Sequence, residues 1–303
     1  FQQIRSATSI ITFGGVRFLI DPMLSPMGTY PSVPHTCSTG RGNPDCELPC
    51  TPEAVLDVDA VIVTHLHFDH FDEAAIKLLP KTLPLFSQSE EEAATIRGYG
   101  FEDVRVLREE GVEFKGVTLY RTACDHGSSN LATMALYKEV QLSEKASGVV
   151  FESASEKERF YLAGDTIYCS LVVDAIGKYK PGIIAVNAAG AQAPLGHPII
   201  MNQYDVLTLM NDYPQLTVIA THVEGVSHAI ASAGICYRPR TVQTSDSGRW
   251  RSSRILTTFR RPKETGTLKK SPRPTPWKTQ SPRQALTTQK PGQPLRRARP
   301  LPR

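Results

Sequence analysis

Four side chains of the kinds that bind metal ions lie within six residues of this chain, directly after a short apolar run. Imidazole and carboxylate groups are the ligands that borderline divalent ions such as zinc prefer. The alternative is a solvated polar loop without a metal. The whole chain has only eight histidines, so three of them within six residues are not expected by chance. We therefore interpret as a metal site the segment Thr64-His65-Leu66-His67-Phe68-Asp69-His70, which follows Val61-Ile62-Val63.

Three later segments repeat this arrangement of a strand-like run followed by polar residues. Each run is short and apolar or β-branched, so the polar residues would leave the end of a strand. Residues 117–120 precede Cys124-Asp125-His126-Gly127, residues 160–162 precede Ala163-Gly164-Asp165-Thr166, and residues 216–219 precede Ala220-Thr221-His222. The residues alone leave Asp125 and His126 as alternatives, because neighbouring side chains of a strand point in opposite directions.

The HxHxDH pattern and these later segments together resemble the metallo-β-lactamase superfamily. The resemblance implies two divalent ions and favours His126 over Asp125, because the family has histidine at that position. A metal-bridging hydroxide would then attack the substrate, with Asp69 and Asp165 as the catalytic carboxylates. Zinc is the ion we expect, although manganese and iron accept the same ligand types. The implied ligands are His65, His67 and His126 for the first ion, Asp69, His70 and His222 for the second, and Asp165 as the bridge.

Within this superfamily the chain is most similar to the L-ascorbate-6-phosphate lactonase-like branch. The likeness covers residues 4–232 and implies a lactone or phosphoester hydrolase. The matching segments are Phe18-Leu19-Ile20-Asp21-Pro22, Asp69-His70-Phe71-Asp72, Gly196-His197-Pro198-Ile199-Ile200-Met201 and Thr221-His222-Val223-Glu224-Gly225-Val226-Ser227-His228.

Three further polar residues have two interpretations each. His197 and His228 either contact the substrate at the mouth of the site or serve the loops in which they lie. Asp21 either supports the metal ligands from behind or belongs to a turn, since Asp-Pro is a common turn sequence.

The net charge of +4 combines an acidic and a basic part. Residues 237–303 contain 18 Lys or Arg and 2 acidic residues, so residues 1–236 carry a net charge of −12. We predict a hydrolase domain at 1–235 and a basic, proline-rich tail at 236–303 that is disordered or encoded out of frame. As an alternative, runs such as Arg296-Arg297-Ala298-Arg299 would bind nucleic acid, which we otherwise do not expect as a partner.

The cellular setting follows from weaker signals. The chain has no apolar run of ~18 residues and no signal-peptide pattern, so we expect neither a membrane span nor a retained leader. It starts with Phe1, so we expect that an upstream part has been removed. Six cysteines without a CxxC pair agree with a cytoplasmic protein. A homo-oligomer is left open.

The periodicity of the domain predicts an α/β (or α+β) fold, and the resemblance implies a four-layer αββα sandwich with the metals at one edge between the sheets. The expected strands are residues 9–13, 16–20, 60–64, 83–86, 148–151, 160–163 and 183–186. The expected helices are residues 73–79, 90–99, 171–176 and 203–211, and we take the acidic run at the start of the second helix as a solvated cap.

These observations predict a dinuclear, metal-dependent hydrolase of a small molecule, either a lactone or a phosphoester. Two alternatives remain open at this stage. One is a phosphodiesterase that acts on a lipid or nucleotide. The other is an inactive, truncated domain whose basic tail binds nucleic acid.

Overall fold

A computed structural model describes residues 1–33, 40, 42–139, 142–193, 196–229 and 258–259. These residues belong to one compact unit, Phe1–Arg261. The basic tail predicted at 236–303 lies outside the described residues except for residues 258 and 259, so its disorder, its reading frame and its nucleic-acid binding stay predictions. None of the helices in the described ranges is long and apolar enough to cross a membrane.

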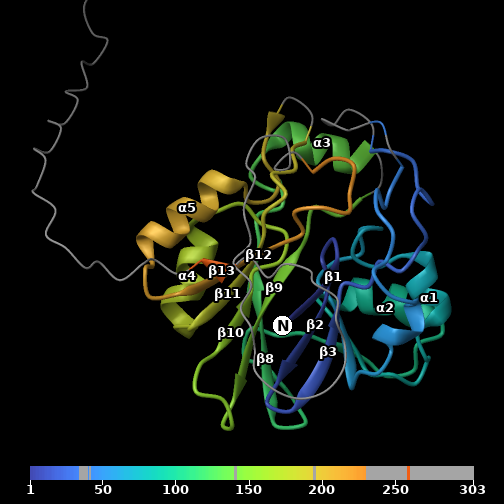
Figure 1. The fold of residues 1–303 in the computed structure, drawn as a ribbon, viewed down its shortest axis with the longest axis horizontal. Helices are drawn as coiled ribbons and strands as arrows, with labels where there is room; N and C mark the ends of the chain where they lie inside the picture. Colours follow the sequence, from blue (N-terminus) through green and yellow to red (C-terminus); the bar gives the residue numbers. More distant parts are fainter. Residues whose placement is uncertain (34–39, 41, 140–141, 194–195, 230–257, 260–303) are drawn as a thin grey trace, which may run out of the picture. The chain divides into compact units, whose positions relative to one another are not determined.

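The strands form two mixed sheets (Figure 1). In the first sheet the strands lie in chain order, antiparallel from β1 to β3 and parallel from β3 to β6. Its strands are β1 (Gln2–Arg5), β2 (Thr8–Phe13), β3 (Val16–Ile20), β4 (Ala60–Val63), β5 (Leu85–Ser87) and β6 (Val104–Val106). The second sheet contains β7 (Val112–Phe114), β8 (Val117–Ala123), β9 (Ser147–Ser153), β10 (Phe160–Leu162), β11 (Ile183–Asn187), β12 (Thr217–Thr221) and β13 (Thr258–Phe259), again in chain order.

Helices cover the outer face of each sheet (Figure 1). Against the first sheet pack α1 (Glu73–Leu78) and α2 (Glu90–Gly98), and against the second pack α4 (Ser170–Tyr179) and α5 (Gln203–Asp212). A short 3₁₀ helix, η1 (Pro52–Val55), precedes β4. The helix α3 (Leu131–Glu139) instead follows the loop at the end of β8.

The side chains of β4 alternate between two apolar cores, which explains why its sequence is apolar throughout. Ala60 and Ile62 contribute to the core between the two sheets, whereas Val61 and Val63 contribute to the core beneath α1 and α2. A strand that is buried on both faces has no polar face. The core between the sheets also contains Phe18 and Phe151, whose rings meet edge to face at 5.4 Å between centroids. The predicted four-layer αββα sandwich is therefore confirmed.

The direction of the strands places the predicted metal ligands at one edge of each sheet. In the second sheet β10, β11 and β12 are mutually parallel. Because β8 and β10 are both antiparallel to β9, β8 runs in the same direction as well. The carboxyl ends of these four strands therefore share one edge. In the first sheet, β4 ends immediately before Thr64 and His65.

Several elements are absent from the sequence prediction. Strands β1, β6 and β7 have only three or four residues, which is too short for an alternating pattern to stand out. Helix α3 has no marked apolar face, since Leu131 is 85% exposed while Tyr137 is buried. The predicted helices at 73–79, 90–99, 171–176 and 203–211 are all present within three residues at each end.

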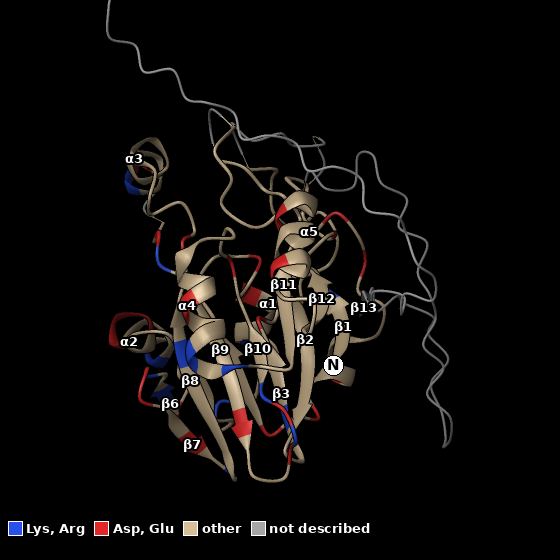
Figure 2. Ribbon diagram, turned by 90° about the vertical axis from the view of Figure 1, so that its left-hand side faces the viewer, with Lys and Arg blue, Asp and Glu red and all other residues tan. Residues whose placement is uncertain are grey.

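The acidic start of α2 is only partly the solvated cap that we predicted. Glu90 and Glu91 are exposed, and Figure 2 shows acidic residues at this helix. Glu92, however, is 7% exposed and accepts a hydrogen bond of 2.7 Å from Nε2 of Gln88. Glu92 takes part in the first turn of the helix, where Oγ of Ser89 accepts from its backbone N–H. The prediction was therefore wrong for Glu92, because this helix turns its third residue toward the protein interior.

Burial should make Glu92 a source of pH-dependent stability. Burial raises the pKa of Glu92 from 4.5 to about 7, so the folded state binds a proton more tightly than the unfolded state. Such a group stabilises the fold at pH values below its unfolded pKa, and this contribution is lost as the pH rises from about 4.5 to about 7. The contribution of Glu92 to the free energy of unfolding should change by on the order of 3 kcal/mol across this pH range. Glu92→Gln should remove this pH dependence, because glutamine does not titrate.

Urea unfolding of both chains in EDTA at pH 5 and pH 8 would measure this effect. We expect the substitution to increase the free energy of unfolding more at pH 8 than at pH 5. Equal changes at the two pH values would contradict the assignment. The matched control is Glu91→Gln, because Glu91 is exposed on the same helical turn.

Candidate metal centre

The structure brings together all seven residues that the sequence suggested as metal ligands. His65, His67, Asp69 and His70 follow β4, and His126, Asp165 and His222 follow β8, β10 and β12. All seven side chains are buried. Their potential ligand atoms lie within 4.8 Å of one another in three groups, which are His65 with His67 and His126, Asp69 with His70 and His222, and His65 with His70 and Asp165.

Asp165 lies at the centre of these groups. Its Oδ2 atom is 3.2 Å from Nε2 of His70, 3.8 Å from Nε2 of His126 and 4.0 Å from Nε2 of His65. The preceding Gly164 makes this position accessible, because it has φ of +70° and a Cβ atom there would lie 2.4 Å from the carbonyl oxygen of Ser147. One carboxylate therefore faces histidines of both of the other groups.

His67 and His126 each use the ring nitrogen that points away from the centre for a hydrogen bond to the backbone, so the other ring nitrogen can face the centre. Nε2 of His67 donates to the carbonyl oxygen of Ser143 at 2.9 Å, and Nδ1 of His126 donates to that of Ile199 at 2.9 Å. Because a carbonyl oxygen only accepts, these bonds fix the proton on the outer nitrogen. Such outer partners are typical of metal-binding histidines.

Two inner nitrogens face Asp165 without a well-aligned hydrogen bond in the described part of the protein. These are Nε2 of His65 and Nε2 of His70, and both are buried. Buried polar atoms are normally satisfied, so exceptions call for an explanation. Two buried nitrogens that face the carboxylate of Asp165 at 3.2 and 4.0 Å, without a well-aligned hydrogen bond, fit the requirements of a bound metal ion.

The charges of the centre also suit a cation. Burial, followed by the neighbouring His70 and His67, lowers the pKa of His65 well below its usual range, and burial lowers that of His67 to about 4. Both rings are therefore neutral ligands at neutral pH. Burial alone would raise the pKa of Asp165, but His70, His126 and His222 outweigh it and hold that pKa well below the usual range.

The pKa of His70 also reflects the nearby carboxylates. Burial alone would lower its pKa, but Asp165, Asp21 and Asp69 outweigh burial and raise that pKa well above its usual value. No Lys or Arg of the described chain forms an ion pair with these three carboxylates, so the centre carries an excess of negative charge. The donor set and its charge therefore fit divalent metal ions.

Asp21 supports this centre from the end of β3. Its carboxylate accepts hydrogen bonds from the backbone N–H of Thr64 at 2.7 Å, from Oγ1 of Thr64 at 2.8 Å and from Nδ1 of His70 at 2.9 Å. These bonds join the ends of β3 and β4 and leave Nε2 of His70 facing inward. Asp21 thus occupies the position that its predicted supporting role requires.

Two supporting residues were missed by the sequence analysis. Asn187 ends β11 and donates from Nδ2 to Oδ1 of Asp165 at 2.5 Å. Ser6 lies between β1 and β2 with φ of 53°, and its Oγ is 3.0 Å from Nδ1 of His222. Asn187 had a signal, since it is a polar residue at the end of a predicted strand. Ser6 had none, because only the folded chain brings it to a residue more than 200 positions away.

The weaker sequence predictions have different outcomes. Asp125 does not turn toward the other ligands, because its Oδ1 accepts from the backbone N–H groups of Gly127 and Ser129 and from Oγ of Ser128. His228 lines the pocket beside the centre. His197 is not among the residues of the described chain that line this pocket, and its contact with substrate stays a prediction.

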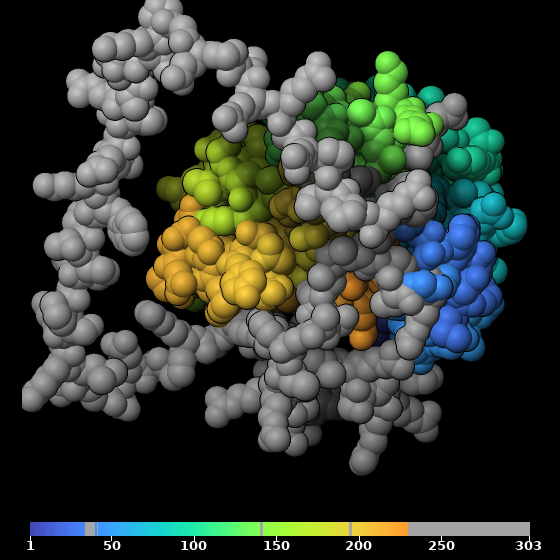
Figure 3. Space-filling view, turned by 90° about the horizontal axis from the view of Figure 1, so that it is seen from above, coloured from blue at the N-terminus to red at the C-terminus, as the bar shows by residue number. Residues whose placement is uncertain are grey.

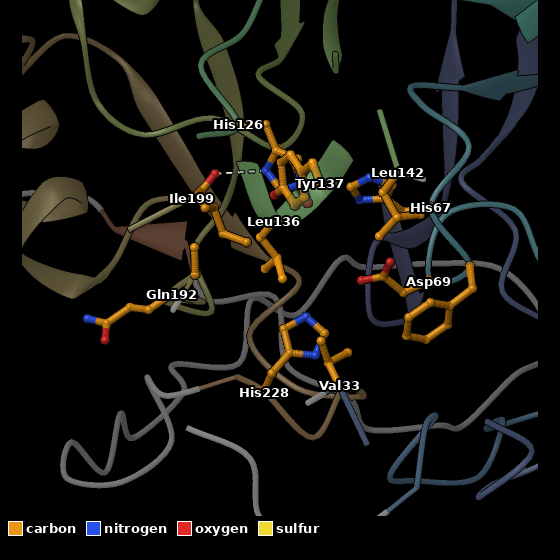
Figure 4. A pocket seen from close by; sticks show the side chains of 13 residues that line it. Val33, His67, Asp69, His126, Leu136, Tyr137, Leu142, Gln192, Ile199 and His228 are labelled. Atoms are coloured by element: carbon orange, nitrogen blue, oxygen red, sulfur yellow. Dashed lines mark hydrogen bonds and ion pairs between the residues drawn. The ribbon is translucent and has the colours of Figure 1, made fainter. Parts of the chain in front are cut away.

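The pocket opens directly onto the centre (Figure 4). His67, His126 and Tyr137 lie on one side of it, and His228 and Val33 lie opposite. Nδ1 of His228 is buried and has no hydrogen-bond partner among the described residues. The remaining lining contains Gln192 and the apolar residues Val33, Phe68, Leu136, Leu142, Ala193 and Ile199.

The sequence and the fold are similar to those of known proteins. A sequence profile described as a beta-lactamase superfamily domain matches residues 16–223. The UPF0173 protein YddR of Bacillus subtilis strain 168 is 38% identical over 227 residues, which cover 75% of this chain and 86% of the relative.

Two solved structures are similar over the same share of the chain. One is the isothiocyanate hydrolase from Delia radicum gut bacteria, with 37% identity and a TM-score of 0.70. The other is described as a possible metal-dependent hydrolase from Veillonella parvula DSM 2008, with 38% identity and a TM-score of 0.70. Each likeness covers 75% of this chain and 86% of the other.

Proposed function

Because the chain belongs to the β-lactamase superfamily and is a metal-dependent hydrolase, we propose that it binds two divalent ions and hydrolyses a small, uncharged, largely apolar molecule. The observation that carries the substrate class is the pocket, whose described lining combines metal-binding side chains with apolar ones and includes no Lys or Arg. The likeness to the L-ascorbate-6-phosphate lactonase-like branch, the cytoplasmic location and a homo-oligomer stay predictions.

The three ligand groups support a dinuclear site. His65, His67 and His126 would hold one ion, Asp69, His70 and His222 the other, and Asp165 would contact both. Divalent ions bound there would act as Lewis acids and lower the pKa of water toward neutrality. Zinc suits this mixture of imidazole and carboxylate, and manganese or iron would accept the same ligands.

The residues of the chain have separate tasks in this proposal. Asp69 lines the pocket, and its carboxylate would orient the attacking water and hold the proton that this water releases. His228 lies opposite, and its unpaired Nδ1 would hydrogen-bond to the substrate. The apolar side chains exclude bulk water and bind the rest of the molecule.

The charge of the pocket favours uncharged substrates over phosphoesters. A phosphate monoester or diester is an anion, and proteins commonly bind it with Arg, Lys or a helix N-terminus. The described lining offers no such cationic side chain. Lactones have a neutral electrophilic carbon, and so do isothiocyanates, which the 37% identical solved relative hydrolyses according to its name. We therefore favour these two classes over a phosphodiesterase.

A metal and substrate measurement on the full chain tests the proposal. We expect about two equivalents of metal after dialysis, together with hydrolysis of γ-nonalactone or benzyl isothiocyanate at a kcat/KM at least ~100-fold above that for bis(p-nitrophenyl) phosphate. Preference for the phosphodiester would select the alternative function. Less than one equivalent of metal, with no turnover of any of these compounds, would overturn the metal-dependent proposal for this chain.

A further inference from the structure

Helix α3 places one polar group beside the metal centre that the proposed mechanism does not yet use. The helix lies at the surface of the molecule (Figure 3), and its first residue, Leu131, is 85% exposed. On its inner side Tyr137 is only 6% exposed and lines the pocket. Leu136 and Leu142 line the same pocket on either side of it in the sequence, so the tyrosine stands among apolar contacts.

The tyrosine ring is packed against two of the candidate ligands. Its centroid lies 5.8 Å from that of His67 and 6.0 Å from that of His126 (Figure 4). The outer nitrogens of both histidines are bound to backbone carbonyls, as described above, so neither outer nitrogen serves the phenol. The ring is therefore packed against two residues of the candidate centre.

The hydroxyl of Tyr137 is buried and has no hydrogen-bond partner among the described residues. A tyrosine hydroxyl in a protein interior usually finds a partner. Packing alone would be served equally well by phenylalanine, which has no polar atom to bury. An unpaired donor at the wall of a pocket is instead suited to a group that arrives with a ligand.

The hydroxyl of Tyr137 can donate a hydrogen bond to an acceptor that a ligand brings. Besides the candidate metal ligands, the polar side chains of the described lining are those of Tyr137, Gln192 and His228, so a substrate acceptor has few other partners there.

We infer that Tyr137 donates a hydrogen bond to the substrate atom on which negative charge develops, and so selects substrates that carry a strong acceptor beside an apolar group. This inference rests on the proposed function. For a lactone the acceptor is the carbonyl oxygen, and for an isothiocyanate it is the nitrogen or sulfur of the N=C=S group. A preorganised donor of this kind stabilises the transition state more than the bound substrate.

Tyr137→Phe removes the hydroxyl and keeps the ring. We expect unchanged metal content, and a kcat/KM for γ-nonalactone that falls about 10- to 100-fold, mainly through kcat. Tyr204→Phe is the matched control, since Tyr204 is 69% exposed on α5.

A comparison of γ-nonalactone with its thiono analogue separates hydrogen bonding from packing. The C=S group is a weaker acceptor than C=O, so the preference for the lactone over the thionolactone should shrink in Tyr137→Phe and stay unchanged in Tyr204→Phe. An unchanged preference together with an unchanged kcat/KM would overturn the inference.

Binding of phenylboronic acid provides a second readout that needs no turnover. Calorimetry on metal-loaded chains should show about tenfold weaker binding to Tyr137→Phe than to the unmodified chain. If the unmodified chain hydrolyses no member of the substrate panel, the proposed function is contradicted. The binding measurement would then still test whether Tyr137 donates a hydrogen bond to a ligand in the pocket. Equal affinities for phenylboronic acid in the two chains would then overturn the inference on its own.

Discussion

Asp165→Ala should bind at least one metal ion fewer than the unmodified chain, and its kcat/KM should fall by about 1000-fold or more. Oδ2 of Asp165 lies within 4.0 Å of ring nitrogens of His65, His70 and His126, which together represent both ligand groups. Among the carboxylates of the described centre, Asp165 comes closest to histidines of both groups. Metal analysis after dialysis, combined with kinetics on the best substrate of the panel, would measure both effects.

Two further variants control this experiment. Asp165→Asn keeps the shape of the side chain, so a similar loss of metal in a chain with an unchanged circular dichroism spectrum would separate ligand loss from unfolding. Asp174→Ala changes an exposed aspartate on α4 and should leave both metal content and rate unchanged. Two full equivalents of metal and normal turnover in Asp165→Ala would show that the carboxylate does not bridge the site.

The largest effect on stability is expected at Arg5. This side chain is 1% exposed, and its guanidinium donates to the carbonyl oxygens of Cys46 at 3.1 Å, Met23 at 2.7 Å and Ser25 at 2.8 Å. Arg5→Met fills similar space but leaves these carbonyls without that donor, two of them in fully buried bonds. We expect the free energy of unfolding to fall by about 3 to 5 kcal/mol.

Urea unfolding at fixed metal concentration would measure this change. The control is Arg108→Met, because Arg108 is 55% exposed and pairs at the surface with Glu90, where such pairs contribute less than about 1 kcal/mol. A loss in Arg5→Met no larger than in Arg108→Met would mean that solvent readily replaces the buried guanidinium. Arg5 also holds the segment that follows Asp21, so metal affinity should weaken in the same variant.

The first part of the candidate metal centre could be predicted because its candidate ligands are neighbours in the sequence. His65, His67, Asp69 and His70 stand within one loop after an apolar run, so their type and spacing carry the signal. His126, Asp165 and His222 could be suggested only because each follows a strand-like run and because the family pattern asks for them.

The rest depended on contacts that no local pattern encodes. Asn187 reaches Asp165 because β11 lies beside β10, and strand order is a property of the folded sheet. Tyr137 lies on a helix that the sequence analysis did not predict, since α3 buries few of its residues and therefore shows no clear apolar period. Glu92 was misjudged for the related reason that an acidic residue at a helix start is usually solvated.

The order of the ligands along the chain has a consequence for the protein during its synthesis. His222 comes 157 residues after His65, so a ribosome that adds about 5 to 20 residues per second makes it roughly 10 to 30 s later. A nascent chain that has passed Asp165 already contains His65, His67 and His126, but it still lacks His222. Translation that stops before β12 is made would therefore release a polypeptide with one of the two candidate ligand groups complete and the other lacking His222.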